Sequence, residues 1–216
     1  MVVQRNLREA PPKIDHRFDL FAACAPGFES VTAAELFSLG IANPKPVPGG
    51  VEFRGYLAHV YKLNLWSRTA ERILLRVGSF HAITFKELRN NAKQLEWEKF
   101  LRPADRLTIR VTCHKSRLIH SDAVAERVQL AIADRLGAAQ KILADKESAS
   151  TVRKLRGRAP AKSQTPNAAA ETSTQTIVVR LLNDECAISL DTSGELLHFR
   201  GYRQAIAKAP LRETLA

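Results

Sequence analysis

The sequence predicts an α+β protein with two consecutive folded units. Hydrophobic residues make up 45% of the 216 residues and charged residues 25%, values typical of a globular protein with a buried core. Apolar runs with strand character alternate along the chain with segments of helical periodicity, and prolines and glycines separate them. The length suffices for one large domain or two small ones.

The first unit is predicted over residues 18–77, after a polar, proline-interrupted leader over residues 1–17 that is expected to be flexible. The loop over residues 43–50 contains three prolines and can form neither a helix nor a central strand. The expected elements are the strand Phe18–Cys24, the helix Glu29–Leu39 ended by Gly40, the strand Val51–Phe53, the helix Tyr56–Arg68 and the strand Ile73–Val77. One face of the second helix carries Leu57, Val60, Tyr61, Asn64 and Leu65.

The second unit is predicted over residues 78–195, followed by a linker over residues 196–216. Its clearest helix is Ser121–Leu136, with Ser121 as the N-cap residue and Gly137 as the stop. A stretch at about residues 138–175, rich in Ala, Ser, Thr, Lys and Arg, is expected to be a mobile insertion. The other expected elements are a helix from the N-cap Thr84 to about Leu95 and the strands Leu107–Cys113, Ile177–Leu182, Cys186–Leu190 and Leu196–Tyr202.

The charge balance predicts the class of partner. The chain has 33 Lys and Arg against 22 Asp and Glu, a formal charge of +11, and a pI of about 10.0. Such a surface attracts phosphate polyanions, so nucleic acid or an anionic membrane surface is expected, with plain solubility as the alternative. No apolar run approaches the roughly 18–20 residues needed to cross a bilayer, and no secretory signal is visible. We therefore expect a cytoplasmic protein without a membrane partner.

No catalytic motif is visible in the chain. The three cysteines are odd in number and far apart, and Cys113-His114 has no second pair at zinc spacing, so no metal site is predicted. The ten glycines never form a GxG pattern, so no turn for a nucleotide or an adenosyl cofactor is predicted. Asn43-Pro44-Lys45-Pro46 is only superficially similar to the Asn/Asp-Pro-Pro-aromatic motif of amino-group methyltransferases. We expect neither catalytic residues nor a bound cofactor in this chain.

A basic cluster joins the end of a predicted strand to the start of the helix Ser121–Leu136. Hydroxyl and cationic donors come together with the free backbone N–H groups of the helix N-terminus, a combination that suits phosphate. The alternative is a solvated loop with an ordinary helix cap. The candidate residues are Lys115, Ser116, Arg117, His120 and Ser121. The basic segment Arg153–Arg158 is either a solvated loop or an arm that contacts RNA.

Three segments together resemble a known family. They are Cys113–Arg127, Ile188–Arg203 and Ala209–Ala216, and they follow a small unit with the element order of a ferredoxin-like domain. The sequence resembles the N-terminal region of THUMP-containing RNA methyltransferases, in particular the bacterial group that methylates guanine N2 of 23S ribosomal RNA. The resemblance implies a ferredoxin-like domain over residues 18–77 and an α/β THUMP domain over residues 78–195. The last segment stands where the catalytic domain begins in the family, so the chain is expected to be a truncated form or the product of a split gene.

The resemblance also implies a function for the chain. A THUMP domain binds structured RNA, here 23S rRNA, through its basic face and positions it for an attached C-terminal methyltransferase domain. S-adenosylmethionine is then the cofactor of that domain and not of this chain. The family pattern carries RNA contacts onto Lys115, Arg117, His120 and Ser121, and more weakly onto Arg127. The segment with Arg200, Tyr202 and Arg203 either contacts RNA or packs the linker against the catalytic domain.

Three rival functions stay open at this point. The first is a THUMP module of another RNA-modifying enzyme, such as a thiouridine synthase, a pseudouridine synthase or a deaminase. The second is a ribosome-binding protein without any chemistry. The third is a DNA-binding domain, which the charge permits, although no helix has the pattern of a helix-turn-helix recognition helix.

Overall fold

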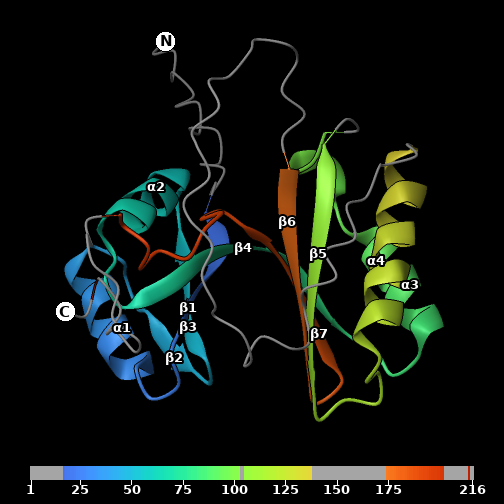
Figure 1. Cartoon of the computed structure of the whole chain (residues 1–216), viewed down its shortest axis with the longest axis horizontal. Coiled ribbons are helices and arrows are strands. Elements are labelled where there is room, and N and C mark those ends of the chain that lie inside the picture. The colour runs from blue at the N-terminus through green and yellow to red at the C-terminus, as the bar shows by residue number, and fades with distance from the viewer. Residues whose placement is uncertain (1–16, 103–104, 138–173, 202–213, 215–216) are drawn as a thin grey trace, which may run out of the picture.

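The structure, a computed structural model, describes residues 17–102, 105–137, 174–201 and 214 (Figure 1). The expected leader, most of the expected insertion with its segment Arg153–Arg158, and Tyr202 and Arg203 lie outside the described residues. The α+β class is confirmed. The elements are β1 (Phe18–Cys24), α1 (Glu29–Ser38), β2 (Lys45–Val47), β3 (Gly50–Gly55), α2 (Leu57–Trp66), β4 (Ala70–His81), α3 (Phe85–Gln94), the 3-10 helix η1 (Trp97–Lys99), β5 (Arg106–His114), α4 (Ser121–Leu136), β6 (Thr174–Leu182) and β7 (Glu185–Asp191).

The seven described strands form one sheet in the order β2-β3-β1-β4-β7-β6-β5, in which only β5 and β6 run parallel. The long strand β4 joins the two parts, because residues 70–75 pair with β1 and residues 74–81 pair with β7. Gly78, the predicted start of the second unit, lies inside β4 next to a register shift. The predicted strand Ile73–Val77 is therefore only the middle of a longer one.

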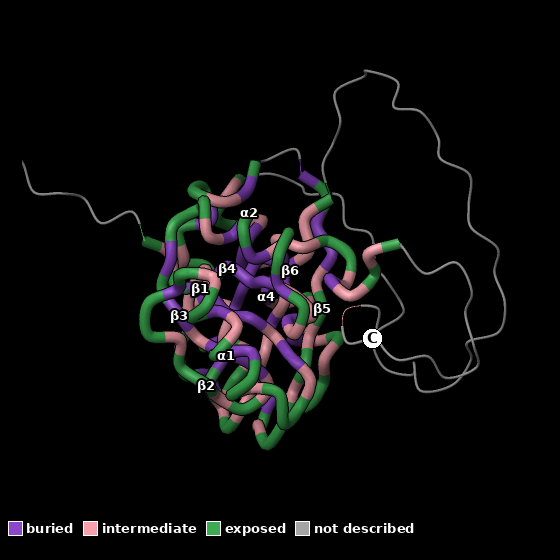
Figure 2. The backbone as a smooth tube through the Cα atoms, turned by 90° about the vertical axis from the view of Figure 1, so that its left-hand side faces the viewer, coloured by how far each residue is buried: buried purple, intermediate pink, exposed green. Residues whose placement is uncertain are grey.

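The register places one apolar row across the sheet. Leu20, Leu75, Leu190 and Ile177 are paired in succession, so their side chains point to the same face. They belong to one buried cluster that also includes side chains of the four described α-helices: Leu36, Leu63, Leu88 and Val128. Figure 1 shows α1 and α2 at one end of the sheet and α3 and α4 at the other, and Figure 2 shows the buried stretches in the interior.

The predicted apolar face of α2 is wrong in part. Val60 and Leu63 are buried, whereas Leu57, Tyr61 and Leu65 are exposed, the last with 71% of its surface accessible. Both rows have helical spacing, so the pattern alone did not distinguish the row at i, i+3 from the row at i, i+4. Asn64 lies between them and donates hydrogen bonds to Val60 O and Thr192 Oγ1.

The strand predicted over Leu196–Tyr202 does not form over its described part. The chain after β7 instead bends along the first half of β4, where Thr192 N donates to Ile73 O and Leu197 N donates to Glu71 O. The Ser193 hydroxyl accepts a hydrogen bond from Ile73 N at 2.9 Å. Side-chain hydrogen bonds and isolated backbone hydrogen bonds take the place of a regular β-ladder here. Of the described residues 192–201, only Leu197 is buried in the core.

The proline-rich loop over residues 43–50 contains the short strand β2. It is one of the two edge strands of the described sheet and pairs with β3. A proline is tolerated there because the outer side of an edge strand needs no hydrogen-bond donor. None of the described helices is long and apolar enough to span a membrane.

Candidate nucleic-acid interface

The basic cluster forms the turn between β5 and α4, residues 114–121, called the β5–α4 turn below. Lys115 has a positive φ of 49°, which reverses the chain directly after β5. Leu118 is buried and anchors the turn to the core, while Lys115, Arg117 and His120 are exposed. The predicted cationic and hydroxyl residues Lys115, Ser116, Arg117, His120 and Ser121 therefore come together at one end of the molecule.

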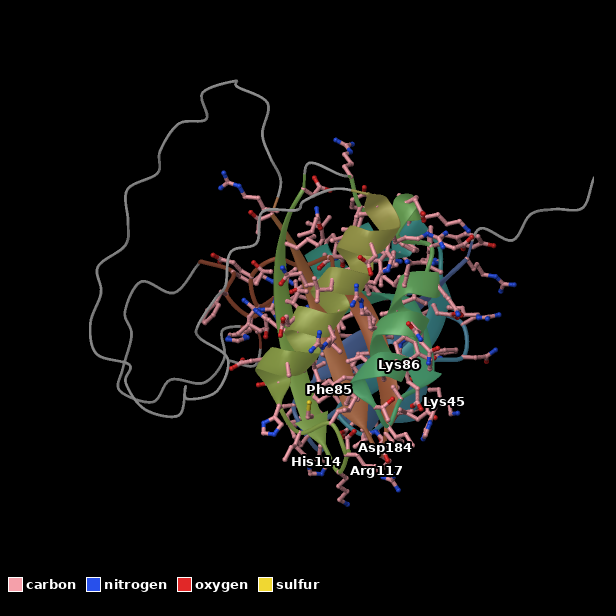
Figure 3. All side chains as sticks on the ribbon, turned by 90° about the vertical axis from the view of Figure 1, so that its right-hand side faces the viewer. Lys45, Phe85, Lys86, His114, Arg117 and Asp184 are labelled. Atoms are coloured by element: carbon pink, nitrogen blue, oxygen red, sulfur yellow. The ribbon has the colours of Figure 1, made fainter. Side chains whose placement is uncertain are left out.

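Asp184, between β6 and β7, holds this turn by hydrogen bonds although it lies more than 60 residues further along the chain. Its Oδ1 accepts hydrogen bonds from Arg117 N at 2.7 Å and from the Ser116 hydroxyl at 2.9 Å. These bonds hold the pKa of Asp184 below its usual value, so the carboxylate stays charged well below neutral pH. Figure 3 shows Asp184 beside Arg117 and His114 at the same end of the molecule.

The hairpin between β6 and β7 supplies Asp184. Asn183 and Asp184 both have positive φ, at 52° and 65°, as the two central residues of a tight type I′ hairpin turn require. Asn183 N donates to His114 O at 3.3 Å, and Ala82 N donates to Asp184 O at 2.9 Å. Three chain segments thus meet at this end: the hairpin, the β5–α4 turn and the start of the connection to α3.

The predicted N-cap of α4 is wrong by one residue. His120 occupies the cap position with extended backbone, its side chain makes no capping hydrogen bond, and Ser121 is the first helical residue. The first backbone N–H groups of α4 have no side-chain cap, so the positive end of the helix dipole lies within the β5–α4 turn. Gly137 ends the helix in the left-handed conformation, as predicted.

The structure does not bring Arg200 to this turn. Its guanidinium donates to Asn64 O and Ser67 O, both at 2.9 Å, at the C-terminal end of α2. Arg200 thus holds the segment after β7 against the helix. Arg127 lies within α4, half-buried and facing α3.

A second group of arginines lies on the sheet face away from the core row. The guanidinium groups of Arg76 and Arg180 lie 5.6 and 5.8 Å from the centre of the Phe21 ring. Arg76 also pairs with Glu52 at 3.4 Å, and Arg180 donates to Pro48 O at 2.8 Å. These cations already have partners within the protein, in contrast to the exposed side chains of the β5–α4 turn.

The described chain offers no other chemistry at this end. No three His, Cys, Asp or Glu side chains gather as a metal site within the described ranges. Cys24 and Cys186 are buried and Cys113 is half-buried, and burial raises the pKa of Cys186 to about 12. Its thiol is therefore protonated and unreactive at neutral pH.

Comparison with known proteins agrees with this arrangement. Residues 19–74 match the model of the RlmL ferredoxin-like domain, and residues 82–191 match the model of the THUMP domain. The ribosomal RNA large subunit methyltransferase K/L of Methylococcus capsulatus is 32% identical over 198 residues, which are 92% of this chain and 24% of that protein.

Two solved structures share the fold over most of this chain. The first, a predicted N6-adenine-specific DNA methylase from Listeria monocytogenes, has a TM-score of 0.73 at 32% identity, covering 92% of this chain and 46% of that one. The second, SMU.472, a candidate methyltransferase complexed with SAH, has a TM-score of 0.70 at 28% identity, covering 94% and 48%. The chain spans between about a quarter and a half of the length of these relatives. With its THUMP match over residues 82–191, it belongs to the THUMP domain family and carries a ferredoxin-like domain of the RlmL type in front of the THUMP domain.

Proposed function

We propose that this chain is the RNA-binding part of an rRNA methyltransferase. It holds structured RNA, in particular 23S rRNA, so that an attached domain methylates a guanine at N2. The observation that supports this most is the β5–α4 turn, in which Asp184 fixes the backbone while Lys115 and Arg117 extend into solvent. The name of the Methylococcus capsulatus relative supports rRNA as the substrate.

Binding follows from charge and shape in this proposal. The ammonium and guanidinium groups of Lys115 and Arg117 neutralise phosphates and release counterions, which makes the affinity depend strongly on salt. A folded RNA helix displays its 2′-hydroxyls and phosphates across a wide, shallow minor groove, so a fixed protein surface recognises its shape rather than its bases. The bonds from Ser116 and Arg117 to Asp184 keep the turn in one conformation, which lowers the entropy lost on binding.

S-adenosylmethionine is the cofactor that we propose for the attached domain, and the SAH bound to SMU.472 supports it. The described residues of this chain do not fit that cofactor. The turn between β1 and α1, Ala25–Phe28, has a single glycine, and two cavities of about 500 Å³ have several Arg, Lys and carboxylate side chains in their lining. We therefore assign no step of the methyl transfer to this chain.

The test is RNA binding measured by fluorescence anisotropy across a salt series. The ligands are a structured 23S rRNA hairpin fragment and a DNA duplex of equal length, because the name of the Listeria relative includes a DNA methylase. We expect a preference for RNA that Lys115→Glu/Arg117→Glu loses. Two lost contacts of about 1.4 kcal/mol each lower the affinity on the order of 100-fold, and the log–log salt slope falls by about two.

The control variant is Arg68→Glu/Arg102→Glu, which changes the net charge equally at two exposed positions outside the turn. It should bind RNA within a few-fold of the wild-type protein. Equal and weak binding of both polymers, unchanged in the turn variant, would contradict the proposal and leave the positive charge as a solubility feature. Tighter binding of the DNA duplex would favour a DNA substrate.

Asp184 gives a second prediction for the same site. Asp184→Ala should lower RNA affinity several-fold, although it removes a negative charge, because Ser116 and Arg117 N lose their acceptor and alanine disfavours the φ of 65°. Asp184→Asn keeps an acceptor oxygen, tolerates this backbone conformation and should bind at least as tightly as the wild-type protein. Anisotropy with the hairpin measures both. If both variants gained affinity equally, the charge of Asp184 would matter and its hydrogen bonds would not.

A further inference from the structure

A basic groove runs between α3 and α4. Its cavity has a volume of about 500 Å³ and is lined by Lys86, Arg89, Asn90 and Lys93 from α3 and by Arg127 and Asp134 from α4. The prediction from sequence contained only one of these residues, Arg127. Figure 3 shows Lys86 on α3, on the same side of the molecule as the labelled residues of the β5–α4 turn.

The periodicity of both helices explains why these residues meet. In α3, Leu88 and Ala92 are buried, which turns the row at positions 86, 89–90 and 93 away from the core. In α4, Val124, Val128 and Ile132 are buried, and Arg127 and Asp134 lie seven residues apart on one side of the helix. From Lys86 to Lys93 the row extends about 10 Å along α3, because each residue of an α-helix rises about 1.5 Å.

The charges of the groove are unbalanced. Four cationic side chains face one carboxylate, and Arg89 pairs with that carboxylate, since its Nη2 lies 2.6 Å from Asp134 Oδ2. In the part of the chain that the structure describes, the side chains of Lys86, Lys93 and Arg127 have no hydrogen-bonding or ion-pair partner. Three positive charges in one groove therefore remain available for an anionic ligand.

We propose that this groove binds the phosphate backbone of the same RNA helix that contacts the β5–α4 turn. The proposal rests on the RNA binding proposed above and adds a second contact. Arg127 follows Ser121 by six residues, about 9 Å along the axis of α4, so the groove begins less than two helical turns from the β5–α4 turn. Proteins that recognise an RNA helix by shape contact its backbone at several separated places, and two basic sites on the same helix of the protein allow this.

The chemistry of the groove favours a polyphosphate over an acidic protein segment. The only large apolar side chain that lines it is that of Phe85, which is half-buried, whereas the centre of a protein interface is usually rich in apolar contacts. Ammonium and guanidinium groups are the usual contacts to a phosphate backbone.

The test uses Lys86→Glu/Lys93→Glu and, to separate contact from repulsion, Lys86→Gln/Lys93→Gln. Both variants change exposed side chains, and circular dichroism and thermal unfolding would verify the fold. We expect the glutamine variant to lower affinity for the 23S rRNA hairpin about tenfold or more and to reduce the log–log salt slope by about two. Hydroxyl-radical footprinting should show lost protection at nucleotides other than those that Lys115→Glu/Arg117→Glu releases.

The outcomes separate this inference from the proposed function. If the turn variant loses RNA binding while both groove variants keep the wild-type affinity, slope and footprint, the groove is not a contact and the function stands. If the wild-type protein shows no preference for RNA, both proposals fail. Competition by poly-glutamate as effective as that by RNA of equal charge would also overturn the groove proposal, because the site would then accept any polyanion.

Discussion

Replacing Asp191 with alanine should lower the free energy of unfolding by about 3–5 kcal/mol, the usual loss when one partner of a buried ion pair is removed. The Asp191 side chain is completely buried and pairs with Arg72, whose side chain is only 16% exposed. Asp191 Oδ1 also accepts a hydrogen bond from Ser193 N at 2.9 Å. Alanine would leave the Arg72 guanidinium half-buried without its carboxylate, with the carbonyl of Gly194 as an acceptor at 2.7 Å.

Chemical denaturation followed by circular dichroism measures this loss. Asp19→Ala is the matched control, because Asp19 also pairs with an arginine, Arg54, but both side chains are at least 60% exposed. An exposed pair contributes about 0–1 kcal/mol, so the two variants should differ by several kcal/mol. Similar stabilities of the two variants would show that burial does not determine the strength of the Asp191 pair.

The position of Asp191 gives this pair its importance for the fold. Asp191 ends β7 opposite Leu74, in the part of β4 that pairs with both β1 and β7. The Asp191–Arg72 pair therefore joins β7 to β4 at the point of the sheet where the ferredoxin-like and THUMP parts meet. We expect Asp191→Ala to weaken the connection between the two parts. It should reduce RNA affinity less than it reduces stability, because the β5–α4 turn lies at the other end of β7.

Local sequence signals predicted the elements that local interactions determine. The bounds of β1 and α4 are those predicted, because β1 is an apolar run interrupted only by Asp19 and α4 combines an apolar row with a glycine stop. Thr84 caps α3 as predicted, with its hydroxyl accepting from Glu87 N at 3.2 Å. In each case the information lies within a few residues of the element.

Interactions between distant segments were the part that the sequence did not predict. Glu35 in α1 accepts hydrogen bonds from Ser67, Arg68 and Thr69, more than 30 residues away, and so fixes the start of β4. The bond from Leu197 N to Glu71 O likewise replaces the strand predicted after β7. Nothing in the pattern near Leu197 indicates that its partner lies so far back in the chain.

The candidate site divides in the same way. The β5–α4 turn was predicted because its basic residues lie within a short stretch of the sequence that directly precedes a recognisable helix. Asp184 lies between the predicted strands Ile177–Leu182 and Cys186–Leu190 and was not predicted as part of the site, since its partners Ser116 and Arg117 come from another segment. Lys86 and Lys93 have the spacing of any solvated helix face, and they gain a meaning only when α4 places Arg127 opposite them.

A second large stability effect is expected at Trp97, in the 3-10 helix η1, which packs beneath α3 and α4. Trp97→Ala should lower the free energy of unfolding by about 3–5 kcal/mol, because the side chain is completely buried and leaves a cavity. Its indole Nε1 also donates to Ala92 O at 2.7 Å, which ties the 3-10 helix η1 to the last turn of α3. Thermal unfolding of the full chain measures the effect.

Trp66, the other tryptophan of the protein, is the control for the effect of burial. It is 67% exposed, so Trp66→Ala should change stability by no more than about 0.5 kcal/mol, and equal losses for both variants would contradict the burial argument. Trp66→Phe leaves Trp97 as the single indole, whose fluorescence should be blue-shifted in the folded state. A loss of that blue shift on binding RNA would mean that α3 moves away from η1, whereas an unchanged spectrum with tight binding would mean that the groove is rigid and already formed in the free protein.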